Sequence, residues 1–480
     1  MKTTIRWTTT ALFAAALLAG GLAAQVDRTK SPALGAPPAL HLPDIRTATL
    51  ANGLTLAVVE MHKVPVVEIQ ALVDAGTARD PADLPGLAAF TANMLTQGAG
   101  TRGTLALADE VAYLGAQLNA ASDFDVVTVR LHVPKRHLEP ALDLLADVLL
   151  RPQFADSEVT RQRGLLANTI LQQRDQPVAM AGIAFPAVVL GAGHPYGHPA
   201  AGNDSTPPKL TRERVVAFYQ AAYRPNATRI LIVGDITLDE AKRLLTARFG
   251  AWPRGAVAAF PQAAAPAPAA RSFYLVDKPG AAQSVIRIGE PGVARSTPDY
   301  ATLQVLNTIL GGAFTSRLNQ NLRETHGYTY GASSAFAARR MPAFFVAAAS
   351  VVTAKTDSSL IEFMKELRRI RDEAVPQAEL DKAKSYIALQ LPGAFETSGG
   401  AAARFRDLLV YGLPLDWYDR FIPAVGAVTA ADVQRAARRY IDPDHLAIVV
   451  VGDRAQIEAG IKALNEGPIV YRTMWGAPVP

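Results

Sequence analysis

An internal repeat constrains the fold of this chain more than any other feature. The strings Ile232-Val233-Gly234-Asp235 and Val450-Val451-Gly452-Asp453 each end an apolar run, and they stand 218 positions apart. Thr211 and Thr429 each lie 24 residues before the respective Asp and open a stretch with helical periodicity, where a Thr hydroxyl commonly caps a helix. The matched order of elements predicts two copies of one fold within 480 residues.

Strand and helix patterns are mixed within the halves. Residues 47–60 alternate apolar and polar side chains around Asn52-Gly53, which predicts a β-hairpin. Helical periodicity follows at 85–95 and at 105–114. We therefore predict an α+β fold, in which each half is a mixed, largely antiparallel sheet packed with helices.

Composition suggests where the halves meet. Residues 253–271 are rich in Ala and Pro and carry almost no charge, which is the composition of a semi-rigid linker. We expect one domain at 45–252 and a second at 272–480. A proline-rich segment at 25–44 shows no apolar periodicity and is expected to form an extended lead-in.

The first residues, 1–24, have the pattern of a secretory signal peptide. Lys2 and Arg6 precede the apolar run 11–18, and small residues follow up to Ala24. We expect cleavage near Ala23 or Ala24 and a secreted, periplasmic protein. The open alternative is a retained membrane anchor, although the 18 positions from Trp7 to Ala24 are marginal for spanning a bilayer. No later stretch is long and apolar enough to span a membrane.

Charge and cysteine content exclude several classes of site. Lys+Arg 48 against Asp+Glu 43 leaves a net charge of only +5, and the basic residues gather in nothing larger than short pairs. Nucleic acid is therefore not an expected partner. Because the chain has no cysteine, disulfides, thiolate nucleophiles and cysteine-based metal sites are excluded.

Several short motifs, taken in order, resemble the pitrilysin/insulinase family of zinc peptidases. That family includes mitochondrial processing peptidase and two-subunit bacterial members, and the resemblance covers nearly all of the chain after the signal. It implies that two peptidase-like domains form one half of a clamshell. The motifs are Leu50 to Leu54, Val73 to Asp80, Gly86 to Phe90, Leu114 to Ala120, His194 to Gly197, Leu310 to Leu318 and Leu322 to Glu324.

The resemblance also implies that the zinc site is lost. Active members carry H-x-x-E-H on a helix, where two imidazoles on one face bind Zn²⁺ and the Glu activates its water. The matching residues here are Ala89, Ala92 and Asn93, and the family's further Glu ligand matches Asn168. Alanine cannot ligate a metal, so we expect this chain to bind none.

Histidines elsewhere offer one alternative metal site. His194 and His198 have the i, i+4 spacing, but Pro195 and Gly197 between them argue against a helix. The simpler interpretation is that these histidines are hydrogen-bonded within the protein or exposed to solvent and bind no metal. A stand-alone metallopeptidase with a rearranged site at this pair stays open as an alternative.

The second half keeps residues that the family uses on substrate. Arg323 and Tyr330 match an Arg and a Tyr that position the substrate carbonyl, and both can donate to charge that develops on oxygen. The competing interpretation is an Arg beside Glu324 and a Tyr buried in a strand. Asn119 and Ala120 match the family's active-site edge strand, which can pair with extended peptide. An ordinary hairpin strand explains the same pattern equally well.

Together these features predict a non-catalytic, substrate-positioning subunit of a two-component zinc metallopeptidase. In two-subunit members the zinc lies on one chain and the Arg–Tyr pair on the other, so we expect zinc on a homologous partner and peptides as substrates. Two alternatives stay open: the stand-alone metallopeptidase with a rearranged metal site, and a peptide-binding or structural scaffold without catalysis.

Overall fold

The computed structural model describes residues 42–266 and 270–479. The predicted signal peptide at 1–24 and most of the lead-in lie outside these residues. Residues Leu40–Pro480 group as one compact unit. Among the helices described, none combines the length and the apolar character needed to cross a bilayer.

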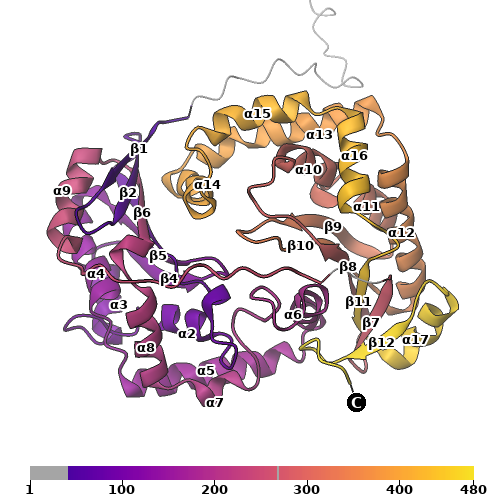
Figure 1. The fold of residues 1–480 in the computed structure, drawn as a ribbon, viewed down its shortest axis with the longest axis horizontal. Coiled ribbons are helices and arrows are strands. Elements are labelled where there is room, and N and C mark those ends of the chain that lie inside the picture. The colour runs from indigo at the N-terminus through magenta and orange to yellow at the C-terminus, as the bar shows by residue number, and fades with distance from the viewer. Residues whose placement is uncertain (1–41, 267–269, 480) are drawn as a thin grey trace, which may run out of the picture. The chain divides into compact units, whose positions relative to one another are not determined.

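The first half contains a six-stranded sheet in the order β1-β2-β6-β3-β5-β4 (Figure 1). The predicted hairpin is confirmed, because β1 and β2 pair antiparallel and meet at Thr49 and Thr55. The strands are β1 (Ile45–Thr49), β2 (Thr55–Glu60), β3 (Val66–Val73), β4 (Gln117–Ser122), β5 (Val127–Pro134) and β6 (Thr228–Gly234). The helices are α2 (Leu87–Met94), α3 (Thr104–Tyr113), α4 (Leu138–Leu150), α5 (Asp156–Gln173), α6 (Pro177–Leu190), α7 (Thr206–Lys209), α8 (Arg212–Ala222) and α9 (Leu238–Phe249).

The second half contains another six-stranded sheet, in the order β12-β7-β11-β8-β10-β9. Its strands are β7 (Ser272–Asp277), β8 (Gln283–Pro291), β9 (Thr329–Ala337), β10 (Phe344–Val352), β11 (Ala447–Gly452) and β12 (Ile469–Arg472). The α-helices are α10 (Tyr300–Asn307), α11 (Arg317–Asn319), α12 (Thr356–Asp372), α13 (Gln377–Gln390), α14 (Ser398–Tyr411), α15 (Trp417–Ala427), α16 (Ala430–Tyr440) and α17 (Arg454–Ala463). Two π-helical turns, η4 (Thr308–Gly312) and η5 (Gln320–Thr325), flank α11.

Strand order confirms the predicted duplication and the α+β class. The strands β2-β6-β3-β5-β4 and β7-β11-β8-β10-β9 follow one order, with the first pair parallel and the remaining pairs antiparallel. The sixth strands differ, because β1 is antiparallel to β2 whereas β12 is parallel to β7. Thr211 and Thr429 cap α8 and α16 as expected, each accepting from a first-turn N–H.

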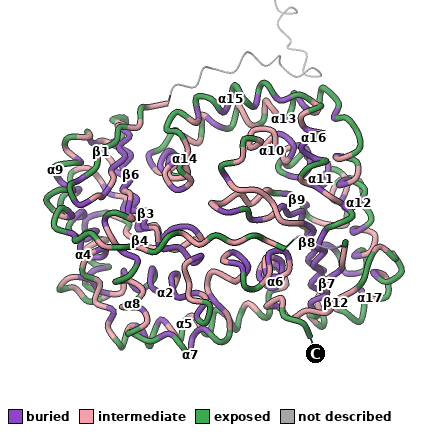
Figure 2. Tube along the Cα trace, in the orientation of Figure 1, coloured by how far each residue is buried: buried purple, intermediate pink, exposed green. Residues whose placement is uncertain are grey.

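One helix of the second half covers the first sheet. α14 packs against β6 and β3, and Figure 1 shows it beside the N-terminal strands. Phe405 of α14 belongs to one buried cluster with Val59 and Val233 of the first sheet. The opposite face of that sheet carries a separate buried cluster with the N-terminal half's own helices (Figure 2). The first sheet is therefore buried on both faces, and one cover comes from the other half.

The reverse exchange occurs on the second sheet. α6 of the first half packs against β11 and β8, and its Phe185 lies in one buried cluster with Val285 and Val449. The linker contributes Phe260 to the edge of this cluster, and Ala258 accepts a hydrogen bond from Arg79 (2.7 Å). The segment that we expected to be only a spacer is therefore docked, although its described residues form no helix or strand. The domain boundaries at 253–271 stay a prediction.

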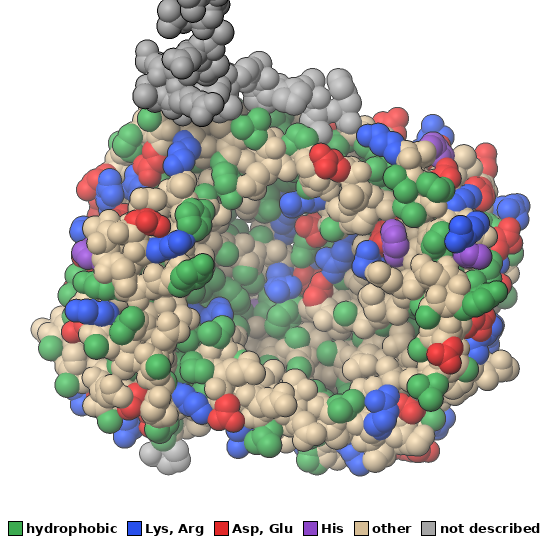
Figure 3. Space-filling view, turned by 180° about the vertical axis from the view of Figure 1, so that it is seen from behind, with side chains coloured by type: hydrophobic (Ala, Val, Ile, Leu, Met, Phe, Trp, Pro, Cys, Tyr) green, Lys and Arg blue, Asp and Glu red, His purple; other side chains and the backbone are tan. Residues whose placement is uncertain are grey.

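Polar contacts also join the halves. Arg340 pairs with Asp74, and Arg406 pairs with Asp123. The Tyr196 hydroxyl bonds to Asp125 and accepts from the Met341 N–H (3.2 Å). In the view from behind, the surface is hollowed near its middle, and side chains of both charge signs gather there (Figure 3).

Candidate functional site

Helix α2 carries three of the positions where the zinc motif was expected. Its first turn is held by Asp80, whose carboxylate accepts from the N–H groups of Gly86 (2.6 Å) and Ala88 (2.7 Å). Burial raises the pKa of Asp80 to about 7, although these two donors favour the charged form. Ala92 is fully buried, Ala89 is half-buried and Asn93 is exposed.

These residues do not fit a zinc ion. The two alanines supply no donor atom, and the Asn93 amide donates to Gln162 of α5 (3.5 Å). Gln97 reaches the Asn93 side-chain oxygen (3.5 Å) and accepts from Arg161 (2.7 Å). Neutral amides therefore occupy the place of a metal-binding set, since zinc sites in proteins use imidazole, thiolate and carboxylate ligands.

Asn168 lies on a different side of α5 from the residue that contacts α2. Gln162 is buried against α2, whereas Asn168 is exposed and lines a cavity of about 690 Å³ with Gly164 and Leu171. Six residues along a helix rotate a side chain by about 240°, so Asn168 does not share the face of Gln162. By the same geometry Thr169, about two turns beyond Gln162, does share that face, although its side chain is exposed. The role of Asn168 stays a prediction. Sequence reasoning missed the contact of Gln162 with Asn93, because no local pattern links two residues 69 positions apart.

His194 and His198 lie in a loop, as Pro195 and Gly197 indicated. His194 is 5% exposed, and its Nδ1 accepts the Tyr196 N–H (3.0 Å). Burial lowers the pKa of both histidines. Across residues 42–266 and 270–479, no three His, Asp or Glu side chains are grouped closely enough to share a metal ion. The rearranged metal site therefore receives no support from the geometry.

Strand β4, with Asn119 and Ala120, is an edge of the first sheet. It pairs only with β5, so its outer edge has no strand partner among the described residues. Side chains alternate along it, with Asn119 exposed and Ala120 half-buried beside the core. A cavity of about 550 Å³ adjoins the strand, and none of its lining residues is charged. Such an edge can accept an extended peptide through main-chain hydrogen bonds.

Arg323 and Tyr330 are brought together in the second half. Arg323 lies in the π-helical turn η5, and Tyr330 is the second residue of β9. The Arg323 guanidinium carbon lies 5.1 Å from the Tyr330 ring centre, and the Tyr330 side chain is 88% exposed. Arg323 also lies 3.4 Å from Glu324. The expected alternative of a buried Tyr is therefore wrong, while the pairing of Arg323 with Glu324 is present.

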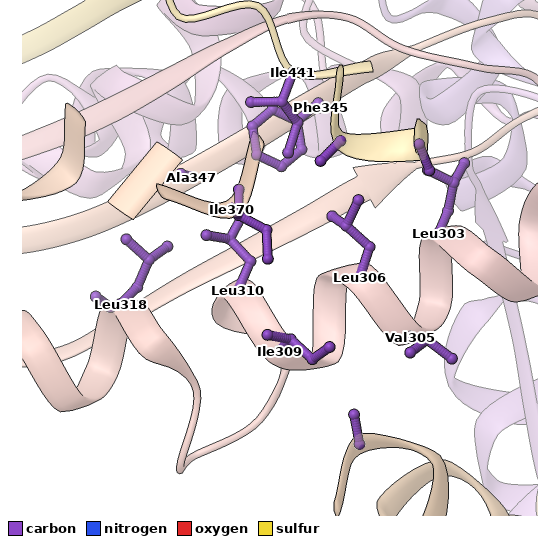
Figure 4. Packing of buried hydrophobic residues seen from close by; sticks show 14 of the residues in the cluster. Leu303, Val305, Leu306, Ile309, Leu310, Leu318, Phe345, Ala347, Ile370 and Ile441 are labelled. Carbon is purple, nitrogen blue, oxygen red and sulfur yellow. The ribbon is translucent and has the colours of Figure 1, made fainter. Parts of the chain in front are cut away.

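The glycine-rich segment before Arg323 lies directly on β9. A Cβ atom on Gly311 would lie 2.3 Å from the Ser334 backbone nitrogen, so this position requires glycine. Leu310 and Leu318 bracket the segment, and Figure 4 shows both pointing into the core that holds Phe345. The buried Arg317 is anchored by two hydrogen bonds to Glu379 (2.9 and 2.6 Å). The segment is therefore fixed at both ends, and no hydrogen bond of the described residues joins this site to α2 or β4.

Comparison with known proteins places the chain in one family. Residues 55–184 match the domain described as Insulinase (Peptidase family M16), and residues 209–387 match the domain described as Peptidase M16 inactive domain. An uncharacterized zinc protease of Mycobacterium tuberculosis is 26% identical over 422 residues, covering 86% of this chain and 94% of that protein. One from Mycobacterium leprae is 29% identical over 288 residues, covering 60% of this chain and 64% of that protein.

Solved structures share the fold. A peptidase M16 inactive domain from Pseudomonas fluorescens superposes with a TM-score of 0.79 at 25% identity, over 85% of this chain and 98% of that one. A protease from Helicobacter pylori superposes with a TM-score of 0.80 at 21% identity, over 85% and 100%. With both domains matched in order on a duplicated α+β chain, this protein belongs to the insulinase family of peptidases, peptidase family M16.

Proposed function

We propose that this chain is a non-catalytic, substrate-positioning subunit of a two-component zinc metallopeptidase. The observation that carries the proposal is an asymmetry between the halves. Ala89 and Ala92 leave α2 without metal-binding atoms, whereas Arg323 and Tyr330 lie together with the Tyr exposed. In this proposal the zinc is bound by a homologous partner, and this chain supplies none of the metal ligands.

The retained pair has a defined chemical task. When a peptide carbonyl is attacked, negative charge develops on its oxygen, and fixed donors near that oxygen lower the barrier. A guanidinium and a phenol can both donate hydrogen bonds to such an oxygen. The exposure of Tyr330 makes it accessible to a substrate held by another chain.

The free edge of β4 supports a second task, peptide holding. An extended peptide could add to the sheet beside Asn119 and Ala120, with main-chain hydrogen bonds giving affinity that needs no catalytic side chain. The same observation favours a second candidate function, a peptide-binding scaffold that never meets a catalytic partner. A partner that restores cleavage would decide against the scaffold.

The proposal is tested by reconstitution. The chain is purified alone and together with a homologous peptidase that retains H-x-x-E-H, and peptide hydrolysis is measured in the presence of zinc. We expect no turnover from this chain alone, turnover from the pair, and a loss of at least about tenfold in kcat for Arg323→Ala in the assembled pair. Arg420→Ala, at an exposed arginine of α15, is the matched control and should leave turnover unchanged.

Two results would overturn the proposal. One is robust zinc-dependent hydrolysis by this chain alone. The other is an assembled pair whose activity is the same with Arg323→Ala as with the unchanged chain.

We also propose secretion through the segment 1–24. N-terminal sequencing of the protein recovered from the periplasm tests this, since an N-terminus before residue 23 would contradict it.

A further inference from the structure

Phe314 is an exposed aromatic residue that forms part of the Arg323 site. It follows the glycine-rich segment, and its side chain is 62% exposed. The Arg323 guanidinium carbon lies 4.4 Å from the Phe314 ring centre, nearer than the 5.1 Å to Tyr330. Both distances lie within the range in which a cation is attracted to an aromatic face. Arg323 thus contacts two exposed aromatic rings.

The backbone that carries Phe314 is tied to the strand that carries Tyr330. Asn319 is 4% exposed, and its amide donates to the Phe314 carbonyl (2.7 Å). Its side-chain oxygen accepts the N–H of Ala332 in β9 (3.0 Å). One buried side chain therefore ties the backbone of Phe314 to that of β9, two positions beyond Tyr330.

Besides the two rings, Arg323 has one charged neighbour. The half-exposed carboxylate of Glu324 lies 3.4 Å from the Arg323 Nε. An exposed ion pair of this kind is weak, so it does little to fix the orientation of the guanidinium. Contact with two ring faces restricts the orientation of the planar guanidinium and leaves its N–H groups at the rim free to donate.

We infer that Phe314 is a positioning residue that holds the Arg323 guanidinium, with Tyr330, in the orientation needed to bind a substrate carbonyl. The inference rests on the proposed function, since Arg323 is the group that would touch the substrate. Phe314 acts through Arg323, and its π face, rather than its bulk, is what the position requires. A substitution that keeps the size of the side chain but removes the ring should therefore not hold the Arg323 guanidinium in that orientation.

The first measurement needs no partner and no activity. Phenylglyoxal modifies free guanidinium groups, and mass spectrometry of the digested chain gives the modification rate of Arg323 alone. We expect Phe314→Leu and Phe314→Ala to raise that rate about threefold or more, because the ring no longer covers the group, and Phe314→Tyr to leave it unchanged. Tyr113→Ala, at another highly exposed aromatic on α3, should have no effect. Equal rates in the unchanged chain and Phe314→Leu would overturn the inference.

The second measurement uses the assembled peptidase. Phe314→Leu should lower kcat about threefold to tenfold with little change in KM. A misdirected Arg323 guanidinium loses hydrogen bonds to the substrate oxygen that form mainly in the transition state. Phe314→Tyr, which keeps the ring, should have the kcat of the unchanged chain. Unchanged kcat in Phe314→Leu would overturn the role of the ring in positioning. If no partner restores hydrolysis, the proposed function fails, while the modification rates still decide whether Phe314 holds Arg323.

Discussion

At the scale of residues, helix α2 is present where the zinc motif was expected, but Ala89 and Ala92 offer no metal-binding atoms. α2 begins at the expected place, where the Asp80 carboxylate accepts hydrogen bonds from the N–H groups of Gly86 and Ala88. Ala92 is buried, and small apolar side chains at such positions pack without strain. The difference from the expected motif lies in the side chains, although the full burial of Ala92 means that a Glu there must displace its neighbours.

Restoring the ligands tests which residue of α5 would complete a metal site. The triple variant Ala89→His, Ala92→Glu, Asn93→His supplies only two imidazoles from this chain, so we expect weak zinc binding. Adding Thr169→Glu should tighten it at least about tenfold, because Thr169 shares the helix face of Gln162, which contacts Asn93. Adding Asn168→Glu should do so much less. Competition with a chromophoric chelator measures the affinities, and a stronger effect from Asn168→Glu would support the original assignment of that residue.

At the scale of elements, the duplication supplies paired helices whose caps differ. Thr429 caps α16 with a reciprocal capping box, in which Asp432 accepts from the Thr429 N–H (2.9 Å). Thr211 caps α8 only through a 3.4 Å contact from the Arg214 N–H. We expect Thr429→Ala to lower the free energy of unfolding by about 1–2 kcal/mol, and Thr211→Ala by about 0.5 kcal/mol. Urea unfolding monitored by circular dichroism compares them, and equal losses would show that the box adds nothing.

The same cap predicts a pH dependence. Hydrogen bonds from the Thr429 hydroxyl and N–H, followed by Arg435, lower the pKa of Asp432 to about 2. Because this value lies below that of the unfolded chain, the contribution of Asp432 is fully present above about pH 4 and is lost as the pH falls toward 2. The stability difference between the unchanged chain and Asp432→Asn should therefore shrink below pH 4. A difference that stays constant down to pH 2 would contradict the assigned pKa.

Local patterns predicted several helices and strands, but not which sheet each helix would cover. The hairpin at Asn52-Gly53, helix α2 and the caps at Thr211 and Thr429 each follow from short-range signals, and all are present. Helix α6 (PVAMAGIAFPAVVL) is apolar on every side, which indicates burial between two surfaces but does not identify them. The contact of Phe314 with Arg323 was also not predictable, because it depends on the fold of the glycine-rich segment over β9.

At the scale of the whole molecule, the exchange of helices makes the two halves depend on each other. α14 buries one face of the first sheet, and α6 buries one face of the second. The ion pairs of Arg340 with Asp74 and of Arg406 with Asp123 cross between the same halves. A half expressed without the other would expose an apolar sheet face, so we expect that the repeat unit of the sequence does not fold independently.

Cutting the linker tests this dependence. A site for a specific protease, inserted after the exposed Ala264, breaks the chain between the halves while leaving α6 and α14 in place. We expect the two fragments, separate on a denaturing gel, to elute together from a sizing column. Phe185→Ala, which removes a fully buried ring of α6 at a cost of about 3–5 kcal/mol, should make the cut protein dissociate on dilution. Phe249→Ala, at an equally buried ring within the first half's own core, should destabilise that half without the same selective dissociation. If the unchanged fragments separate as readily as those with Phe185→Ala, the exchanged helices are not what holds the halves together.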